Sequence, residues 1–190
     1  MRLLLGLLLT LTLATFLGLG GTWYATTRGV AFGSVKVGPW TAAPRAGTLS
    51  IEPYTRASIA RTGELPMASG DGVAFTARTD DSGKPLDGRC EVAVSGTTPL
   101  ARYWTLTLYD TDGQPVANPL NRFGFTSQEI VRRNDGTFQI VVAPRARPGN
   151  WLPVGAPGPY VLVLRLYDTP VGLTSRAGRE MPSIGMGACP

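Results

Sequence analysis

Two stretches of alternating side chains limit this chain to a fold built mainly of β-strands. Along residues 103–109, apolar side chains alternate with tyrosines and threonines. This period of two is typical of a strand with one buried face. Residues 160–167 follow the same pattern, and both stretches end in Leu-Tyr-Asp-Thr; aligning these ends matches Leu106 with Leu164 and Trp104 with Leu162. The two strands are therefore predicted to be central in an all-β core.

The rest of the chain is divided by turn-forming residues into short segments. There are 24 glycines and 16 prolines, a frequency that suits short strands joined by turns. Strands are predicted at residues 34–37, 72–79, 89–95, 129–132 and 137–142. The last two flank Asn134-Asp135-Gly136, a hairpin signal. Residues 50–61 are predicted to form one short helix capped by Ser50, and residues 114–123 and 144–159 to form loops. This order favours an antiparallel two-sheet β-sandwich.

An apolar segment precedes the predicted sandwich. Residues 3–24 contain no charged side chain, and as a helix they would extend about 33 Å, close to the thickness of a bilayer core. Trp23 and Tyr24 resemble an interfacial aromatic belt, which favours a retained transmembrane anchor. The small residues at 18–20 also suit a cleavable signal peptide, so that alternative stays open. We divide the chain into a signal anchor or signal peptide at 1–28 and a β-sandwich at 29–190.

The composition argues against several classes of function. The chain has no histidine, the commonest general base and zinc ligand, and we expect no metal or other cofactor. No serine lies in a nucleophile elbow. Asp110-Thr111-Asp112-Gly113 begins like a calcium loop but lacks the later ligands, so a hairpin turn is predicted there. Without Arg2 and Arg28, 16 basic residues face 13 acidic ones with no long basic run, and we expect no nucleic-acid partner.

The two cysteines give information about location. Cys90 lies on the face of a predicted strand, and Cys189 lies in a tail rich in glycine and proline. We predict that they form a disulfide, which requires an oxidising compartment.

Five sequence blocks resemble a known family, called domain of unknown function 1214. They are YWTLTLYD (103–110), NPLNR (118–122), NDGTF (134–138), NWLP (150–153) and LVLRLY (162–167). The resemblance covers about residues 71–168. Larger relatives carry this domain after a second one, domain of unknown function 1254, whose place is taken here by the membrane segment. The resemblance implies a jelly-roll-like β-sandwich, and it supplies no assigned catalytic residues.

The candidate binding residues lie on one strand face and on two loops. Arg165 lies in mid-strand on the same face as Tyr167, and the matching face of residues 103–109 carries Tyr103 and Tyr109. A guanidinium among aromatic rings can stack on them or bind a carboxylate or phosphate. It can also pair with a structural carboxylate or extend to solvent. The loop candidates are Asn121, Arg122 and Trp151, because loops on a rigid sandwich commonly carry binding sites.

These features favour a membrane-anchored, extracytoplasmic binding or interaction module at a bacterial envelope. We expect the domain on the periplasmic or extracellular side of the inner membrane, with a small ligand or an envelope protein as its partner. Two alternatives remain: an envelope hydrolase that uses a pair of carboxylates, and a structural accessory to a membrane protein. A hydrolase predicts two converging carboxyl groups with separated pKa values.

Overall fold

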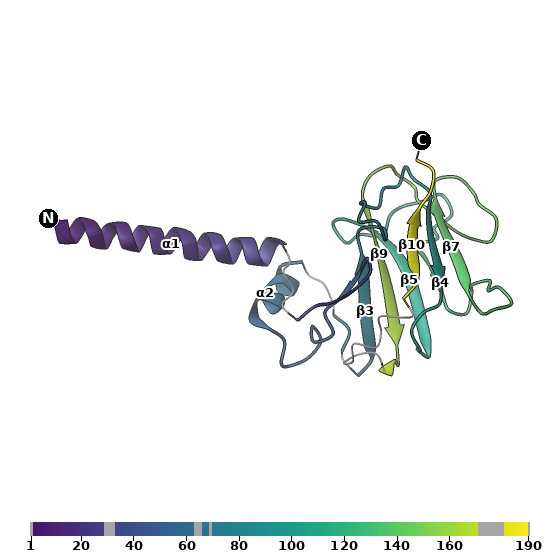
Figure 1. The fold of residues 1–190 in the computed structure, drawn as a ribbon, viewed down its shortest axis with the longest axis horizontal. Helices are drawn as coiled ribbons and strands as arrows, with labels where there is room; N and C mark the ends of the chain where they lie inside the picture. Colours follow the sequence, from purple (N-terminus) through teal and green to yellow (C-terminus); the bar gives the residue numbers. More distant parts are fainter. Residues whose placement is uncertain (1, 29–32, 63–65, 69, 171–180, 190) are drawn as a thin grey trace.

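A long helix leads into a domain made of two β-sheets (Figure 1). The computed structural model describes residues 2–28, 33–62, 66–68, 70–170 and 181–189. Helix α1 (Arg2–Arg28) projects away from the sheets, and helix α2 (Pro53–Thr62) lies close to the base of α1. The predicted all-β fold with one short helix and an apolar N-terminal helix is confirmed.

The larger sheet contains both strands with the strongest alternation. Its order is β1 (Val35–Val37), β2 (Trp40–Ala42), β3 (Gly72–Ala77), β9 (Tyr160–Tyr167), β5 (Tyr103–Asp110) and β6 (Gly124–Thr126). All neighbours in this sheet are antiparallel. Strand β9 pairs with β3 on one side and β5 on the other, so the predicted central position of β5 and β9 is correct. Their antiparallel register sets Leu106 opposite Leu164, but Trp104 opposite Leu166 rather than Leu162.

The smaller sheet covers the apolar face of the larger one. Its order is β10 (Ser183–Met186), β4 (Val92–Gly96), β7 (Phe138–Ala143) and β8 (Asn150–Pro153). Strands β7 and β8 run parallel, which departs from the purely antiparallel expectation. The core between the sheets is continuous, and its largest fully buried side chains include Trp40, Phe138, Ile140, Leu106, Leu162 and Leu164.

Four strands were not predicted, because their residues are poor strand formers or their segments are very short. Strand β8 lies within the predicted loop 144–159 and contains Asn150 and Pro153, two residue types depleted in strands. Asn150 is accommodated in this buried strand because its side-chain amide donates hydrogen bonds to the backbone carbonyls of Val131 and Gln139, at 2.8 and 2.9 Å. Strand β10 contains a glycine, and β2 and β6 have three residues each.

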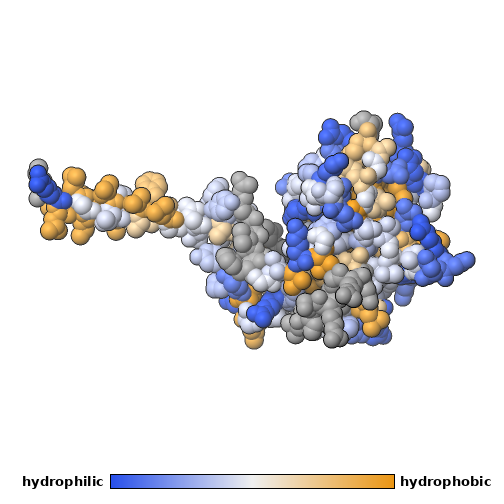
Figure 2. Space-filling model, viewed as in Figure 1, coloured by the Kyte–Doolittle hydropathy of each residue, from blue (hydrophilic) through white to orange (hydrophobic). Residues whose placement is uncertain are grey.

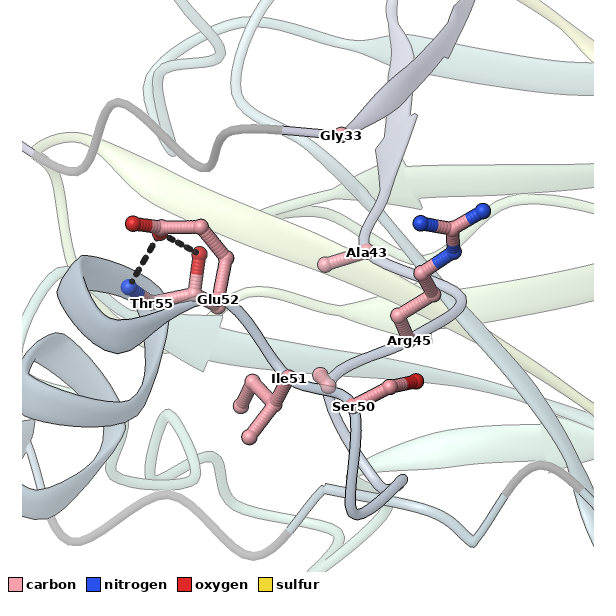
Figure 3. Close-up of a pocket in the computed structure, with 8 residues that line it drawn as sticks. Gly33, Ala43, Arg45, Ser50, Ile51, Glu52 and Thr55 are labelled. Atoms are coloured by element: carbon pink, nitrogen blue, oxygen red, sulfur yellow. Dashed lines mark hydrogen bonds between the residues drawn. The ribbon is translucent and has the colours of Figure 1, made fainter.

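Other boundaries also differ from the prediction. Residues 129–132 form no strand; only Arg132 makes an isolated bridge, to Phe138, although the turn at 134–136 is present. Helix α2 is capped by Glu52 and not by Ser50. The Glu52 carboxylate accepts a hydrogen bond from the backbone N–H of Tyr54 at 3.0 Å. It also accepts bonds from the backbone N–H of Thr55 at 2.9 Å and from the Thr55 hydroxyl (Figure 3). A carboxylate here satisfies free helix donors and complements the helix dipole.

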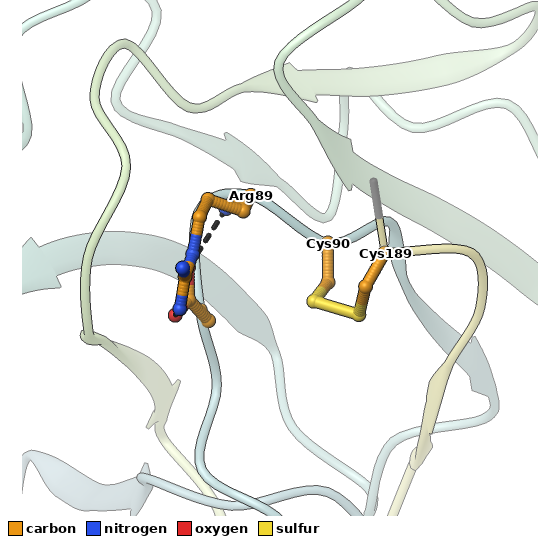
Figure 4. The surroundings of a disulfide bond; sticks show 4 residues. Arg89, Cys90 and Cys189 are labelled. Carbon is orange, nitrogen blue, oxygen red and sulfur yellow. Dashed lines mark hydrogen bonds and ion pairs between the residues drawn. A yellow bond between two sulfur atoms is a disulfide. The ribbon is translucent and has the colours of Figure 1, made fainter.

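The predicted bond between Cys90 and Cys189 is present, with the two Cα atoms 4.1 Å apart (Figure 4). Cys90 is buried just before β4, which begins at Val92 and not at the predicted residue 89. The C-terminal segment is held by more than this bond, because β10 pairs along β4 from Ser183 to Met186.

Helix α1 is long and apolar enough to cross a membrane, a property that a signal peptide near an N-terminus shares. Its leucines are exposed along its whole length, and Figure 2 shows them as an apolar surface outside the domain. The hydroxyls of Thr10, Thr12 and Thr15 donate to carbonyls three or four residues earlier. These bonds satisfy polar groups that water would not reach inside a bilayer.

Candidate functional site

The outer face of the larger sheet brings together four of the predicted binding residues. In β5 and β9, core residues alternate with half-buried ones, and Tyr103, Tyr109, Arg165 and Tyr167 all belong to the half-buried set. Between them lie short side chains in register, with Thr107 beside Val163 and Thr105 beside Arg165. We call the surface formed by these residues the sheet-face surface.

Arg165 is the cationic residue at the centre of the sheet-face surface. Its Nη1 donates to the hydroxyl of Tyr109 at 3.1 Å, and its guanidinium carbon lies 5.4 Å from the centre of the Tyr109 ring. Among the described residues, no carboxylate forms an ion pair with Arg165. Tyr103 and Tyr167 pair instead with each other, with ring centres 5.7 Å apart. A guanidinium held by a ring and one hydroxyl retains donors for a further partner.

Trp151 lies on a different surface. It alternates with the buried Asn150 and Leu152 on β8, so its indole is on the outer side of the smaller sheet. The indole Nε1 donates to the carbonyl of Ala143 at 2.9 Å. The structure therefore does not bring Trp151 together with Arg165, and the described bond gives the indole a structural contact.

Asn121 and Arg122 lie close to Trp151. Arg122 donates to the Trp151 carbonyl at 3.3 Å and lies over the Phe125 ring, 5.3 Å from its centre. Asn121 has a positive φ of 51° in an exposed turn. Asn118 organises that turn, since its side chain bonds the backbone of Arg122 through both the amide and the carbonyl oxygen. The loop candidates form a second group, separate from the sheet-face surface.

Several carboxylates stabilise turns. Asp80 is 5% exposed, and its Oδ1 accepts bonds from the Ser82 hydroxyl and from the N–H groups of Ser82 and Lys84. Burial raises its pKa, but these hydrogen bonds outweigh burial and lower the pKa overall. Asp110 Oδ1 binds the N–H groups of Asp112 and Gln114 in the same way, so the predicted turn at 110–113 is confirmed.

The lowered pKa values of several carboxyl groups do not favour the hydrolase hypothesis. Hydrogen bonds from the Arg89 side chain hold the pKa of Asp87 well below its usual range, and bonds within the turn at Thr137 lower the pKa of Asp135. The pKa of Glu52 is lowered as well, because the bonds at the start of α2 outweigh its desolvation. A general acid near neutral pH needs a raised carboxyl pKa. The carboxyl groups of Asp80, Asp87, Asp135 and Glu52 have lowered pKa values instead.

Tyr160 has a hydroxyl with no hydrogen-bond partner among the described residues. The residue is 2% exposed and points into the core from the start of β9. Burial, and secondarily the nearby Asp87 carboxylate, raise the pKa of this phenol. It is therefore a neutral group, and leaving it unpaired disfavours the folded state.

A small cavity lies between α2 and the segment that precedes it. Its volume is about 180 Å³, and Arg45, Ser50 and Glu52 line it. In Figure 3 the Arg45 side chain extends away from Glu52, whose carboxylate faces the start of α2. Because the helix cap already occupies that carboxylate, the cavity offers few free polar groups to a ligand.

Comparison with known proteins gives a family but no activity. The model of a family described as "Protein of unknown function (DUF1214)" matches residues 71–171, just over half of the chain. The match confirms the resemblance to domain of unknown function 1214 that the five sequence blocks carry. No curated protein matches the chain.

Solved structures similar to this chain include two bacterial proteins. The VPA0106 protein from Vibrio parahaemolyticus has a TM-score of 0.60 and 22% identity, over 73% of this chain and 36% of that protein. An uncharacterized protein from Burkholderia cenocepacia has a TM-score of 0.43 and 19% identity, over 91% of this chain and 51% of that one. The first supports the fold alone, and this chain spans about one third of that protein's length.

Proposed function

Because the chain belongs to the DUF1214 family, whose function is unknown, we propose from its own residues that it is a membrane-anchored binding module. In this proposal α1 anchors the chain in the bacterial inner membrane. The β-sandwich lies on the periplasmic or extracellular side, and the sheet-face surface recognises an envelope protein that presents a carboxylate. No catalytic step is part of the proposal.

The position outside the cytoplasm rests on two independent features. The exposed leucines of α1 need an apolar environment, and either an anchor or a signal peptide would direct the domain across a membrane. The disulfide between Cys90 and Cys189 requires an oxidising compartment, which the cytoplasm of most bacteria is not. Together these features support a domain outside the cytoplasm.

The observation that carries the binding proposal is the environment of Arg165. Its described partner is the Tyr109 side chain, not a carboxylate. A cation near aromatic rings on an otherwise uncharged strand face is complementary to an anionic group, which it can bind through two parallel hydrogen bonds. A carboxylate on a partner protein would complete that arrangement, with the Tyr103 and Tyr167 rings providing apolar contact area beside it.

Site-specific crosslinking in cells tests this proposal. A photoreactive p-benzoylphenylalanine at Thr105, which pairs with Arg165 across β5 and β9, should give a discrete adduct. The same residue at Gln139, half-buried on the smaller sheet, is the control. Adding Arg165→Leu should abolish the Thr105 adduct, while the domain stays folded, because no described carboxylate is left unpaired.

Arg165→Lys separates charge from geometry, since lysine keeps the charge but loses the planar fork. We expect it to weaken the adduct only in part. If Arg165→Leu lowers the free energy of unfolding by roughly 3–5 kcal/mol, Arg165 is a structural ion-pair residue. If instead the adduct persists in a folded Arg165→Leu protein, the site assignment is wrong. A ligand-dependent thermal shift without any adduct would indicate a small molecule as the occupant.

A further inference from the structure

A larger cavity lies at the disulfide end of the sandwich and shares no lining residue with the sheet-face surface. Its volume is about 470 Å³, within the range of small-molecule sites. Its walls come from the segment 88–91, the end of β7 and the residues that follow it, the loop after β8, and the C-terminal segment at Ala188 and Cys189. Figure 4 shows Arg89 beside the disulfide that holds this C-terminal wall in place.

The wall formed by the loop after β8 is fixed on both sides. A Cβ atom added to Gly88 would collide with the Ala156 carbonyl oxygen, and one added to Gly155 would collide with the Ala117 carbonyl oxygen. The Gly88 N–H also donates to the Gly158 carbonyl at 2.8 Å. These close backbone approaches hold the loop against the domain, so the cavity is preformed and a ligand need not order it.

The charged groups at the cavity are mostly cationic. Arg89, Arg145 and Arg147 line it, together with the single carboxylate Glu91. Arg89 pairs with Asp87 at 2.7 Å and Arg147 with Glu91 at 2.6 Å. Arg145 forms no hydrogen bond or ion pair with any described residue. Among the described residues at the cavity, three arginines against two carboxylates leave a net charge of +1, and Arg145 is the arginine without a described partner.

The two paired arginines are held in place and still have free donors. Arg89 uses Nε and Nη2 to bind Asp87, and Arg147 uses Nε for Glu91 and Nη1 for the Ala146 carbonyl. A guanidinium has five N–H donors. Nη1 of Arg89 and Nη2 of Arg147 therefore remain without a described partner. The remaining walls are apolar, including Val154, Ala156 and Pro157.

We infer that this cavity binds a small organic anion, with a carboxylate or phosphate group against the arginines and an apolar body against Val154, Ala156 and Pro157. Arg145 supplies the uncompensated charge. Arg89 and Arg147 contribute oriented hydrogen bonds, and the disulfide keeps the C-terminal wall closed. The site is independent of the sheet-face surface, because neither Arg165 nor its neighbours line the cavity. The sequence signal for it is Pro144-Arg145-Ala146-Arg147-Pro148, two arginines held between prolines directly after a core strand.

Isothermal titration calorimetry tests this inference on the full-length, oxidised protein in a non-ionic detergent. The probes are phenyl phosphate and benzoate, which carry the two anionic groups on the same apolar ring. Inorganic phosphate lacks the ring and phenol lacks the charge. We expect saturable binding of at least one probe, with the tighter one identifying the preferred anionic group. Inorganic phosphate and phenol should bind at least about tenfold more weakly, because each makes half of the contacts.

Two variants locate the binding. Arg145→Gln should weaken the tighter probe by about tenfold or more, the loss of one charge-assisted hydrogen bond. Arg78→Gln is the matched control, since Arg78 is exposed, has no described ion pair and does not line the cavity. It should change the dissociation constant by less than about twofold. Ala188→Trp, at an exposed position on the cavity wall, should fill the space and remove binding while the unfolding temperature is retained.

The inference is overturned if the folded protein binds neither probe at concentrations up to about 10 mM, weaker than this number of contacts allows. It is equally overturned if Arg145→Gln and Arg78→Gln behave alike, or if Ala188→Trp binds as the natural protein does. A null crosslinking result at Thr105 leaves this cavity unaffected, so failure of one proposal can be told from failure of the other.

Discussion

At the scale of single residues, two aspartates perform the same task at corresponding turns. Asp80 follows β3, and Asp110 is the last residue of β5. These two strands lie on either side of β9, and because each is antiparallel to β9, they run parallel to each other. Both turns have the pattern Asp-x-x-Gly-x-Pro, and in both the aspartate Oδ1 accepts N–H groups from the second and fourth following residues. Side-chain bonding of this kind fixes a turn where the backbone alone leaves donors free.

The difference in burial between the two aspartates gives a prediction. Asp80→Ala should lower the free energy of unfolding by about 1–3 kcal/mol, because three donors lose their acceptor at a buried position. Asp110→Ala, which removes two bonds at a more exposed turn, should lower it by less than about 1 kcal/mol. Urea unfolding followed by circular dichroism measures both. Equal losses would show that burial does not set the strength of these turns.

Tyr160 gives a second prediction at the residue scale. Its buried hydroxyl has no described partner, so Tyr160→Phe removes an unsatisfied group and keeps the ring that fills the core. The free energy of unfolding should stay the same or rise by up to about 1 kcal/mol. Tyr109→Phe is the control, since that hydroxyl does accept a bond from Arg165. A clear loss of stability in Tyr160→Phe would mean that the hydroxyl has a partner.

At the scale of elements, the alternation of apolar and polar residues predicted the central strands of the core. It did not predict several strands at the edges of the sheets, because their residues are not typical of strands. Strands β5 and β9 alternate without interruption, so both their position and their buried face follow from the sequence. Strand β8 depends on Asn150, whose amide bonds two distant carbonyls. No local pattern reveals such partners. Strand β10 pairs with β4, which lies far earlier in the chain, as in the pair Ser183 and Ser95, and this too is a tertiary effect.

The candidate sites show the same division. Alternation placed Arg165, Tyr103, Tyr109 and Tyr167 on one face, because strand geometry fixes which side chains share a side. The alternation did not show that Trp151 lies on the smaller sheet, because the segment that forms β8 was expected to be a loop. Nor did it reveal the cavity around Arg145, which is assembled from three segments distant in sequence.

The disulfide gives a prediction for β10. It closes a loop with a sequence separation of 99 residues, and a loop of this size is stabilised by up to about 4.7 kcal/mol in the chain-entropy treatment. Replacing both cysteines by serine should lower the free energy of unfolding toward that limit, and treatment of the natural protein with dithiothreitol should match it. The fold should persist at neutral pH, because β10 also pairs with β4. An unchanged unfolding curve after complete reduction would contradict the stabilising role of the bond.

At the scale of the whole molecule, lowered carboxyl pKa values predict how stability depends on pH. Asp80, Asp87, Asp135 and Glu52 all have folded-state pKa values below their ordinary values of 3.8 or 4.5. Such groups stabilise the folded state fully above the ordinary pKa, and the stabilisation is lost as the pH falls through the folded-state pKa. The urea midpoint should therefore be constant from about pH 7 to 5 and fall below about pH 4. Asp80→Asn should reduce that fall, and a midpoint that rises on acidification would contradict the assignment.

Our proposal for the whole molecule joins a membrane anchor, formed by the apolar helix α1, to a disulfide-bonded domain outside the cytoplasm. One measurement tests both parts of this claim: the intact mass of the protein from the membrane fraction, denatured without reductant in the presence of a maleimide. We predict a chain that retains the segment 1–28, is two hydrogens lighter than the fully reduced form and carries no maleimide. A mature chain beginning near Gly21, or the addition of two maleimides, would contradict an anchored domain outside the cytoplasm.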